Sequence, residues 1–118
     1  MGKTTTTINL GAALAETGLR VLIVDLDPQG NASTGLGIEP DDRTFTSYDL
    51  ILDDVEIERL IHATETANLS LIPANVDLSS ADIELYSNEK RSFLLRDALN
   101  RPELAGGYDF VLIDCPPS

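Results

Sequence analysis

The first seven residues, Met1–Thr7 (MGKTTTT), contain the residue types that bind the phosphates of a nucleotide. Gly-Lys-Thr ends the loop pattern G-x-x-x-x-G-K-[ST]. In that loop, backbone N–H groups surround the phosphates, the lysine reaches the terminal phosphates and the hydroxyl binds Mg²⁺. A helix that follows such a loop directs its positive end at the same anion. Gly2, Lys3 and Thr4 match the end of this pattern. We therefore expect a phosphate site here, and expect the preceding strand and half-loop to lie outside the chain.

Acidic residues stand at the ends of two apolar runs. Asp25 lies near the end of the first run, residues 20–26 (RVLIVDL), and Asp27 lies in the loop after it. Asp114 ends the second run, residues 108–114 (YDFVLID). An apolar strand that ends in aspartate has the form of a Walker B element, whose carboxylate holds Mg²⁺ largely through the water shell of the metal. Ligands of open α/β sheets bind outside the carboxyl ends of the strands. The helix start, the loop at 25–31 and Asp114 should therefore meet in one site.

Helices and strands alternate along the chain in the way that would bring these pieces together. We predict helices at 4–17, 46–53, 54–62, 78–87 and 89–100, strands at 20–26, 69–73 and 108–114, and a surface loop at 32–44. Continuous apolar runs are typical of strands buried on both faces of a parallel sheet. The alternation predicts a right-handed parallel α/β fold. Gly11, inside the first helix, is interpreted as a point of close packing against the sheet.

Composition narrows the possible function classes. The chain has 118 residues, enough for one domain with a core, and a formal net charge of −12. Most acidic residues fall in 39–65 and 77–103, so this segment is a poor surface for DNA phosphates. No apolar run approaches the ~18 residues of a membrane span. Cys115 is the single cysteine, which excludes an intrachain disulfide and fits a reducing, cytoplasmic setting.

These motifs resemble the ParA (Soj) branch of the deviant Walker A ATPases. Residues 2–37 (GKTTTTINLGAALAETGLRVLIVDLDPQGNASTGLG) carry most of the similarity, and residues 111–118 (VLIDCPPS) resemble the Walker B segment of the same branch. The resemblance implies a parallel-sheet P-loop NTPase fold, a Rossmann-like three-layer α/β/α sandwich. Here the fold would be partial and lack its first central strand. Residues 1–118 would be the N-terminal part of a single nucleotide-binding domain, truncated at both ends.

The resemblance also implies ATP and Mg²⁺ as cofactors and a role for each matching residue. In catalysis, Lys3 would contact the β- and γ-phosphates, and Asp27 would position or activate the attacking water. The residues that would bind the nucleotide are Gly2, Lys3, Thr4, Thr5 and Gln29, the last within a loop at 28–31 that senses the γ-phosphate. The residues around the metal would be Thr4, Asp25 and Asp114. For Asp25 a purely structural role at the strand end stays open.

The function implied is ATP hydrolysis in chromosome or plasmid segregation, in the cytoplasm at the nucleoid. The partners would be a second copy in an ATP-bound homodimer, nonspecific DNA bound by regions outside this chain and a ParB-like adaptor, without a membrane. In the family a lysine earlier in the loop, K-G-G-V-G-K-T-T, reaches across that dimer. A residue acting in trans in this way is worth about 10³–10⁵ in rate, so we expect the 118 residues alone neither to dimerise with ATP nor to turn over usefully.

Two rival functions come from the same superfamily. A MinD-like division-site ATPase would bind membrane, but the sequence Pro-Gln-Gly-Asn after Asp27 favours ParA. An iron–sulfur electron donor would need cluster cysteines, and Cys115 alone is poor support for it.

Overall fold

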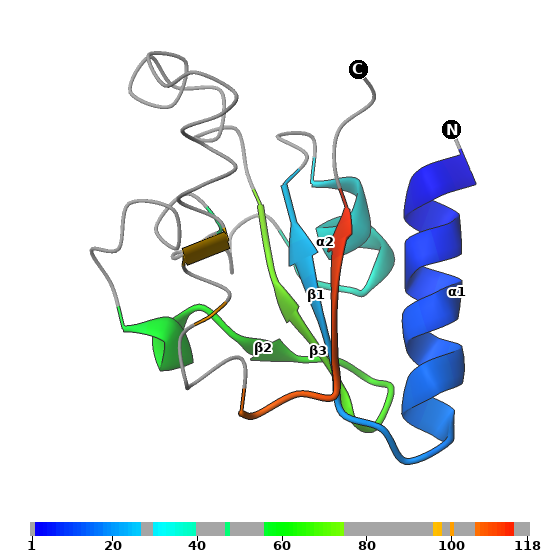
Figure 1. The fold of residues 1–118 in the computed structure, drawn as a ribbon. Coiled ribbons are helices and arrows are strands. Elements are labelled where there is room, and N and C mark those ends of the chain that lie inside the picture. The colour runs from blue at the N-terminus through cyan, green and yellow to red at the C-terminus, as the bar shows by residue number, and fades with distance from the viewer. Residues whose placement is uncertain are drawn as a thin grey trace.

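A four-stranded sheet lies at the centre of the structure, in the order β2-β3-β1-β4 (Figure 1). The computed structural model describes residues 2–26, 30–39, 47, 56–74, 96–97, 100 and 106–114, with only the backbone described for residues 2–4. The strands are β1 (Val21–Asp25), β2 (His62–Ala63), β3 (Leu69–Ile72) and β4 (Phe110–Asp114). β1 pairs in parallel with both β3 and β4, whereas β2 pairs antiparallel with β3. The predicted parallel strands are confirmed, and the sheet is mixed because of the short β2, which the sequence did not predict.

Both faces of β1 are buried, as its apolar run indicated, whereas β4, which was also predicted to be buried, has exposed Phe110 and Ile113. Helix α1 (Gly2–Glu16) stands on one side of the sheet together with α2 (Asn31–Gly35) (Figure 1). Alternate side chains of β1 belong to two separate hydrophobic cores. Val21 and Ile23 belong to the core that contains Ala15 of α1 and Ala32 of α2. Leu22 and Val24 belong to a second core, which contains Ile57, Leu60 and Ile72. Successive side chains of β1 point to opposite faces of the sheet, and both faces are buried at this strand. This explains why residues 21–24 are all apolar.

Gly11 packs closely against the sheet, as predicted. A Cβ at this position would lie 3.1 Å from Ile23 Cδ1 and 3.2 Å from Leu69 Cδ1. Gly11→Leu should lower the free energy of unfolding by about 1–3 kcal/mol, because overpacking displaces both side chains. Urea unfolding followed by circular dichroism measures this. Ala13→Leu, at an exposed position of the same helix, is the matched control, and an equal loss in both variants would contradict the packing explanation.

Two local predictions were wrong. The predicted loop at 32–44 contains α2, although its sequence, NASTG, has weak helix propensity. The predicted helix at 54–62 is replaced by the 3₁₀-helix η2 (Ile57–Arg59) and by β2. Ile57 and Leu60 are both buried at a spacing of three residues, which suits a 3₁₀ turn, and pairing with β3 then takes the chain into a strand.

The predicted helices at 46–53, 78–87 and 89–100 lie almost entirely outside the described residues. None of the helices in the described ranges has the length and apolar character needed to cross a bilayer.

Candidate functional site

Asp25 and Asp114 lie side by side at the carboxyl edge of the sheet. They are the last residues of β1 and β4, and the parallel register makes them Cα partners. Both are buried, with 0% and 1% of their surface exposed. The structure thus brings together the two acidic residues predicted for the metal site. Asp27, predicted to act on the attacking water, and the loop residue Gln29 lie outside the described residues.

Helix α1 begins at this same edge of the sheet (Figure 1). Its first residues, Gly2 to Thr4, already have helical backbone, and Thr5 is exposed. The side chains of Lys3 and Thr4 are not among those described. The first N–H groups of an α-helix have no partner within the helix and carry its positive end. The helix start and the pair of carboxylates therefore lie at one end of the molecule, as the sequence predicted.

Ser33, on α2, binds the carboxylate of Asp25. The backbone N–H of Ser33 donates to Asp25 Oδ2 at 3.0 Å, and Ser33 Oγ donates to the same oxygen at 2.7 Å. Ser33 Oγ also accepts a hydrogen bond from the backbone N–H of Ala74 at 3.1 Å. Both Asp25 and Ser33 are fully buried. The Asp25 carboxylate thus connects β1 to α2 and to the segment after β3.

A second serine, Ser47, binds the main chain of Asp25. Ser47 Oγ donates to the main-chain oxygen of Asp25 at 2.6 Å, and the Ser47 N–H donates to the oxygen of Pro73 at 2.9 Å. The chain reaches α2 through Gly30, whose φ of 66° and ψ of 35° place it in the left-handed region that glycine enters without strain. Sequence reasoning missed both serines, because nothing in the sequence placed their hydroxyls beside a strand end.

The residues at this edge suit a magnesium–nucleotide complex. A buried carboxylate can bind a hard cation directly or accept hydrogen bonds from the waters around it. The start of a helix is a site for phosphate. Within the described ranges no group of three or more His, Cys, Asp or Glu residues could hold a metal ion. Mg²⁺ keeps several waters and takes one or two protein carboxylates beside the phosphates of its nucleotide. Bound there, the ion would neutralise charge on the phosphates.

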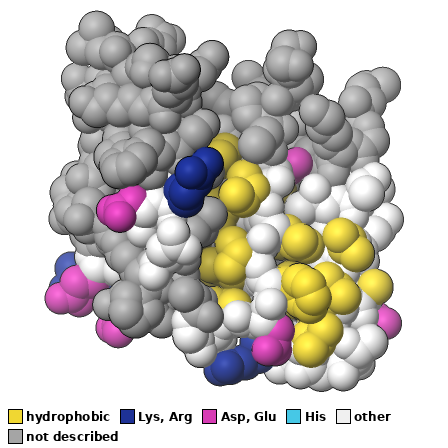
Figure 2. Space-filling view, viewed as in Figure 1, with side chains coloured by type: hydrophobic (Ala, Val, Ile, Leu, Met, Phe, Trp, Pro, Cys, Tyr) yellow, Lys and Arg dark blue, Asp and Glu magenta, His cyan; other side chains and the backbone are white. Residues whose placement is uncertain are grey.

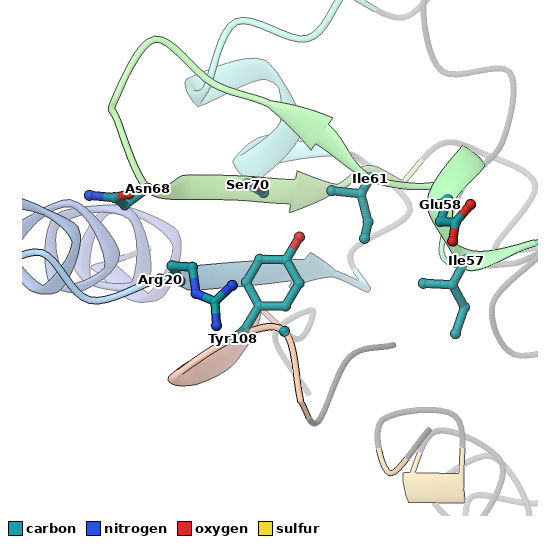
Figure 3. A pocket seen from close by; sticks show the side chains of 8 residues that line it. Arg20, Ile57, Glu58, Ile61, Asn68, Ser70 and Tyr108 are labelled. Carbon is teal, nitrogen blue, oxygen red and sulfur yellow. The ribbon is translucent and has the colours of Figure 1, made fainter. Parts of the chain in front are cut away.

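A separate hollow of about 460 Å³ lies at the opposite end of the strands (Figure 3). Arg20, which precedes β1, and Tyr108, which precedes β4, lie next to each other in its wall. Ile57 and Ile61 supply apolar surface on the other side. It contains none of the residues predicted for the nucleotide site.

Comparison with known proteins gives the family. The family described as AAA domain matches residues 1–118. The chromosome partitioning protein ParA of Myxococcus xanthus is 53% identical over 118 residues, which are 100% of this chain and 41% of that protein. The sporulation initiation inhibitor protein Soj of Bacillus subtilis is 49% identical over the same length, 46% of that protein. The chain therefore spans less than half the length of these relatives.

Solved structures agree on the fold. Cobyrinic acid a,c-diamide synthase from Mycobacterium smegmatis, with bound ADP and magnesium, matches 99% of this chain and 46% of its own at 44% identity, with a TM-score of 0.87. The septum site-determining protein MinD of Pyrococcus horikoshii, complexed with Mg-ADP, matches 99% of this chain and 44% of its own at 34% identity, with a TM-score of 0.73. The predicted P-loop NTPase fold is thereby confirmed. Since the family match covers the whole chain, this chain belongs to the AAA domain family, and its relatives there include the ParA and Soj partitioning proteins.

Proposed function

We propose that this chain is the nucleotide-binding part of an ATPase that segregates chromosomes or plasmids. The observation that carries the proposal is the meeting of Asp25, Asp114 and the start of α1 at one edge of the sheet. Relatives named for chromosome partitioning support the role in segregation, and solved neighbours with bound ADP and magnesium support ATP and Mg²⁺ as the cofactors.

In this proposal Lys3, Thr4 and the backbone of residues 2–5 hold the phosphates, and Asp114 holds the waters of Mg²⁺. Asp27 positions the water that attacks the γ-phosphorus. Catalysis then rests on positioning and on neutralising charge. The partners proposed for the longer protein are a second copy in an ATP-bound homodimer, nonspecific DNA bound by regions outside this chain, and a ParB-like adaptor.

A MinD-like role is the second candidate, since a MinD structure is among the neighbours. The ParA relative is 53% identical and the MinD structure 34%, so the partitioning role is preferred. The coding sequence after residue 118 tests the choice, because a basic amphipathic helix at the C-terminus would favour the membrane-binding role. A Lys-Gly-Gly just before Met1 would complete the phosphate loop that is expected in either case.

The metal role of Asp114 can be tested in a chimera, in which residues 1–118 replace the matching segment of B. subtilis Soj. Asp114→Asn should weaken the Mg²⁺ dependence of nucleotide binding by roughly 10- to 100-fold, because it removes the charge that orders the metal's waters. Titration of Mg²⁺ against a fluorescent ATP analogue measures this.

Glu65→Gln, at an exposed turn, makes the same chemical change as the control for that titration. An Asp114→Asn chimera that keeps the parent Mg²⁺ dependence would remove Asp114 from the proposed site.

A further inference from the structure

The loop that follows β1 is anchored at both of its ends. At its start, the Leu26 N–H donates to the main-chain oxygen of Asp114 at 2.9 Å. At its end, buried Gly30 leads into α2. The three residues between them include Asp27 and Gln29, to which the proposed function gives the attacking water and the γ-phosphate. Because three residues can span only about 10 Å, the places of these two side chains depend on how the two ends of the loop are held.

Ser33 links the two ends of this loop. Its N–H and its hydroxyl both donate to Asp25 Oδ2, at 3.0 Å and 2.7 Å, across a separation of eight residues. Both residues have 0% of their surface exposed, so bulk water does not compete for the carboxylate oxygen. Hydrogen bonds to a charged group are shorter and stronger than those between neutral groups. These two hydrogen bonds therefore fix the distance between the end of β1 and α2, with the whole loop between them.

The hydroxyl of Ser33 also extends the contact to β3. The N–H of Ala74, two residues beyond the end of β3, donates to Ser33 Oγ at 3.1 Å. A hydroxyl has a single proton, so Ser33 accepts from Ala74 and gives its own proton to Asp25. Linked hydrogen bonds in a buried site polarise and strengthen one another. One side chain thus joins the carboxyl ends of β1 and β3 to α2.

The apolar contacts of α2 hold it against its neighbours without fixing its direction. Ala32 belongs to the core that contains Val21 of β1, and a Cβ at Gly35 would lie 2.7 Å from Ile8 Cδ1 of α1. Apolar burial is non-directional. The sequence of α2, NASTG, has no charged residue, and charged side chains are sparse where α1 and β4 lie on the face shown in Figure 2. The hydrogen bonds of Ser33 therefore give α2 a directional contact with the strand end.

We propose that Ser33 is a positioning residue for the hydrolysis of ATP, because it sets the place of the loop that contains Asp27 and Gln29. The inference rests on the proposed function and adds to it a residue that acts through the loop. Ser33 is fully buried, and its hydroxyl already serves as both donor and acceptor, so it does not bind ATP itself. A catalytic group that is displaced by about 1 Å can lose about 10²-fold in rate, so a small error in this loop has a large effect.

Ser33→Ala in the Soj chimera should lower kcat for ATP by about 10- to 100-fold. The Kd for ADP should change little, because Lys3 and the backbone of residues 2–5, which are proposed to hold the phosphates, do not belong to this loop. Gly11→Leu is the control for stability, since it should destabilise the fold by overpacking in the middle of α1 and keep the parent kcat. Equal kcat in Ser33→Ala and Gly11→Leu, at a temperature where both are folded, would reduce Ser33 to a stabilising residue and overturn the proposal.

Combining Ser33→Ala with Asp27→Ala shows whether Ser33 acts through Asp27. Residues that act as a unit do not lose rate independently, so the double variant should have the same kcat as Asp27→Ala alone. A merely stabilising residue would not show this dependence. If Ser33→Ala lowers kcat by the same factor in the Asp27→Ala background as in the parent, Ser33 does not position Asp27 and the proposal is wrong.

Hydrogen exchange of the chimera without nucleotide tests the contact apart from activity. The amide of Ala74 should exchange at least about tenfold faster in Ser33→Ala than in Gly11→Leu, because only the first of these variants removes its acceptor. Unchanged protection of Ala74 in Ser33→Ala would overturn the inference directly. A parent chimera that keeps this protection but does not turn over ATP would instead contradict the proposed function and, with it, the role of Ser33 in hydrolysis.

Discussion

Replacing Asp27 with alanine in the Soj chimera should lower ATP turnover by about 10²–10⁴, the usual contribution of a residue that positions or deprotonates a nucleophile. Nucleotide affinity should change little, because Asp27 is proposed to act on the attacking water and not on the bound phosphates. An interaction made only in the transition state lowers kcat and leaves ground-state binding intact. Phosphate release under saturating ATP gives kcat, and titration with a fluorescent ATP analogue gives Kd.

Lys3→Ala, unlike Asp27→Ala, should weaken nucleotide binding itself, because Lys3 is proposed to contact the β- and γ-phosphates. Glu39→Ala, which removes an exposed carboxylate after α2, is the control for loss of charge in the same region. If Asp27→Ala and Lys3→Ala lose affinity equally, Asp27 holds the nucleotide, and its proposed role in positioning water is wrong. If turnover is unchanged, another group orders the water.

Strands β1 and β4 could be predicted because residues 21–24 and 110–113 are apolar without interruption, a pattern typical of strands in a parallel sheet. The burial of both faces that this pattern also predicts holds for β1 and not for β4. Gly11 fitted one close contact with the sheet. Helix α2 and the turn at Ile57–Arg59 could not be predicted in the same way. Helix α2 follows Gly30, whose backbone is left-handed, and the turn at Ile57–Arg59 buries Ile57 in the core. Local helix propensity does not report either feature.

The candidate site could likewise be predicted only in part. The rule that parallel strands end at a common edge was enough to place Asp25 beside Asp114. It could not place Ser33, because the distance from Ser33 to Asp25 depends on how α2 turns back over the sheet. The sequence left Asp25 with two roles, a metal ligand or a structural residue at the strand end. The hydrogen bonds from Ser33 supply a structural role, and the metal role stays a prediction.

The same hydrogen bonds make Ser33→Ala the substitution with the largest expected effect on stability. It removes a donor to a fully buried carboxylate and the hydroxyl that accepts a hydrogen bond from the Ala74 N–H. A hydrogen bond to a charged group contributes about 1.5–3 kcal/mol and one between neutral groups about 0.5–1.5 kcal/mol, so we expect a combined loss of roughly 2–4.5 kcal/mol. Urea unfolding of the 118-residue chain, at one low concentration to limit self-association, measures the loss.

Ser70→Ala is the matched control, because it removes a hydroxyl from half-buried Ser70 on β3 and should change the free energy of unfolding by no more than about 0.5 kcal/mol. A double-mutant cycle with Asp25→Asn isolates the contact itself, and residues joined by a hydrogen bond should show a coupling of about 0.5–3 kcal/mol. Equal losses for Ser33→Ala and Ser70→Ala, with no coupling to Asp25, would mean that the carboxylate does not depend on Ser33. The structural role of the Asp25 carboxylate would then have to be abandoned, and its predicted role at the metal would be the one that remains.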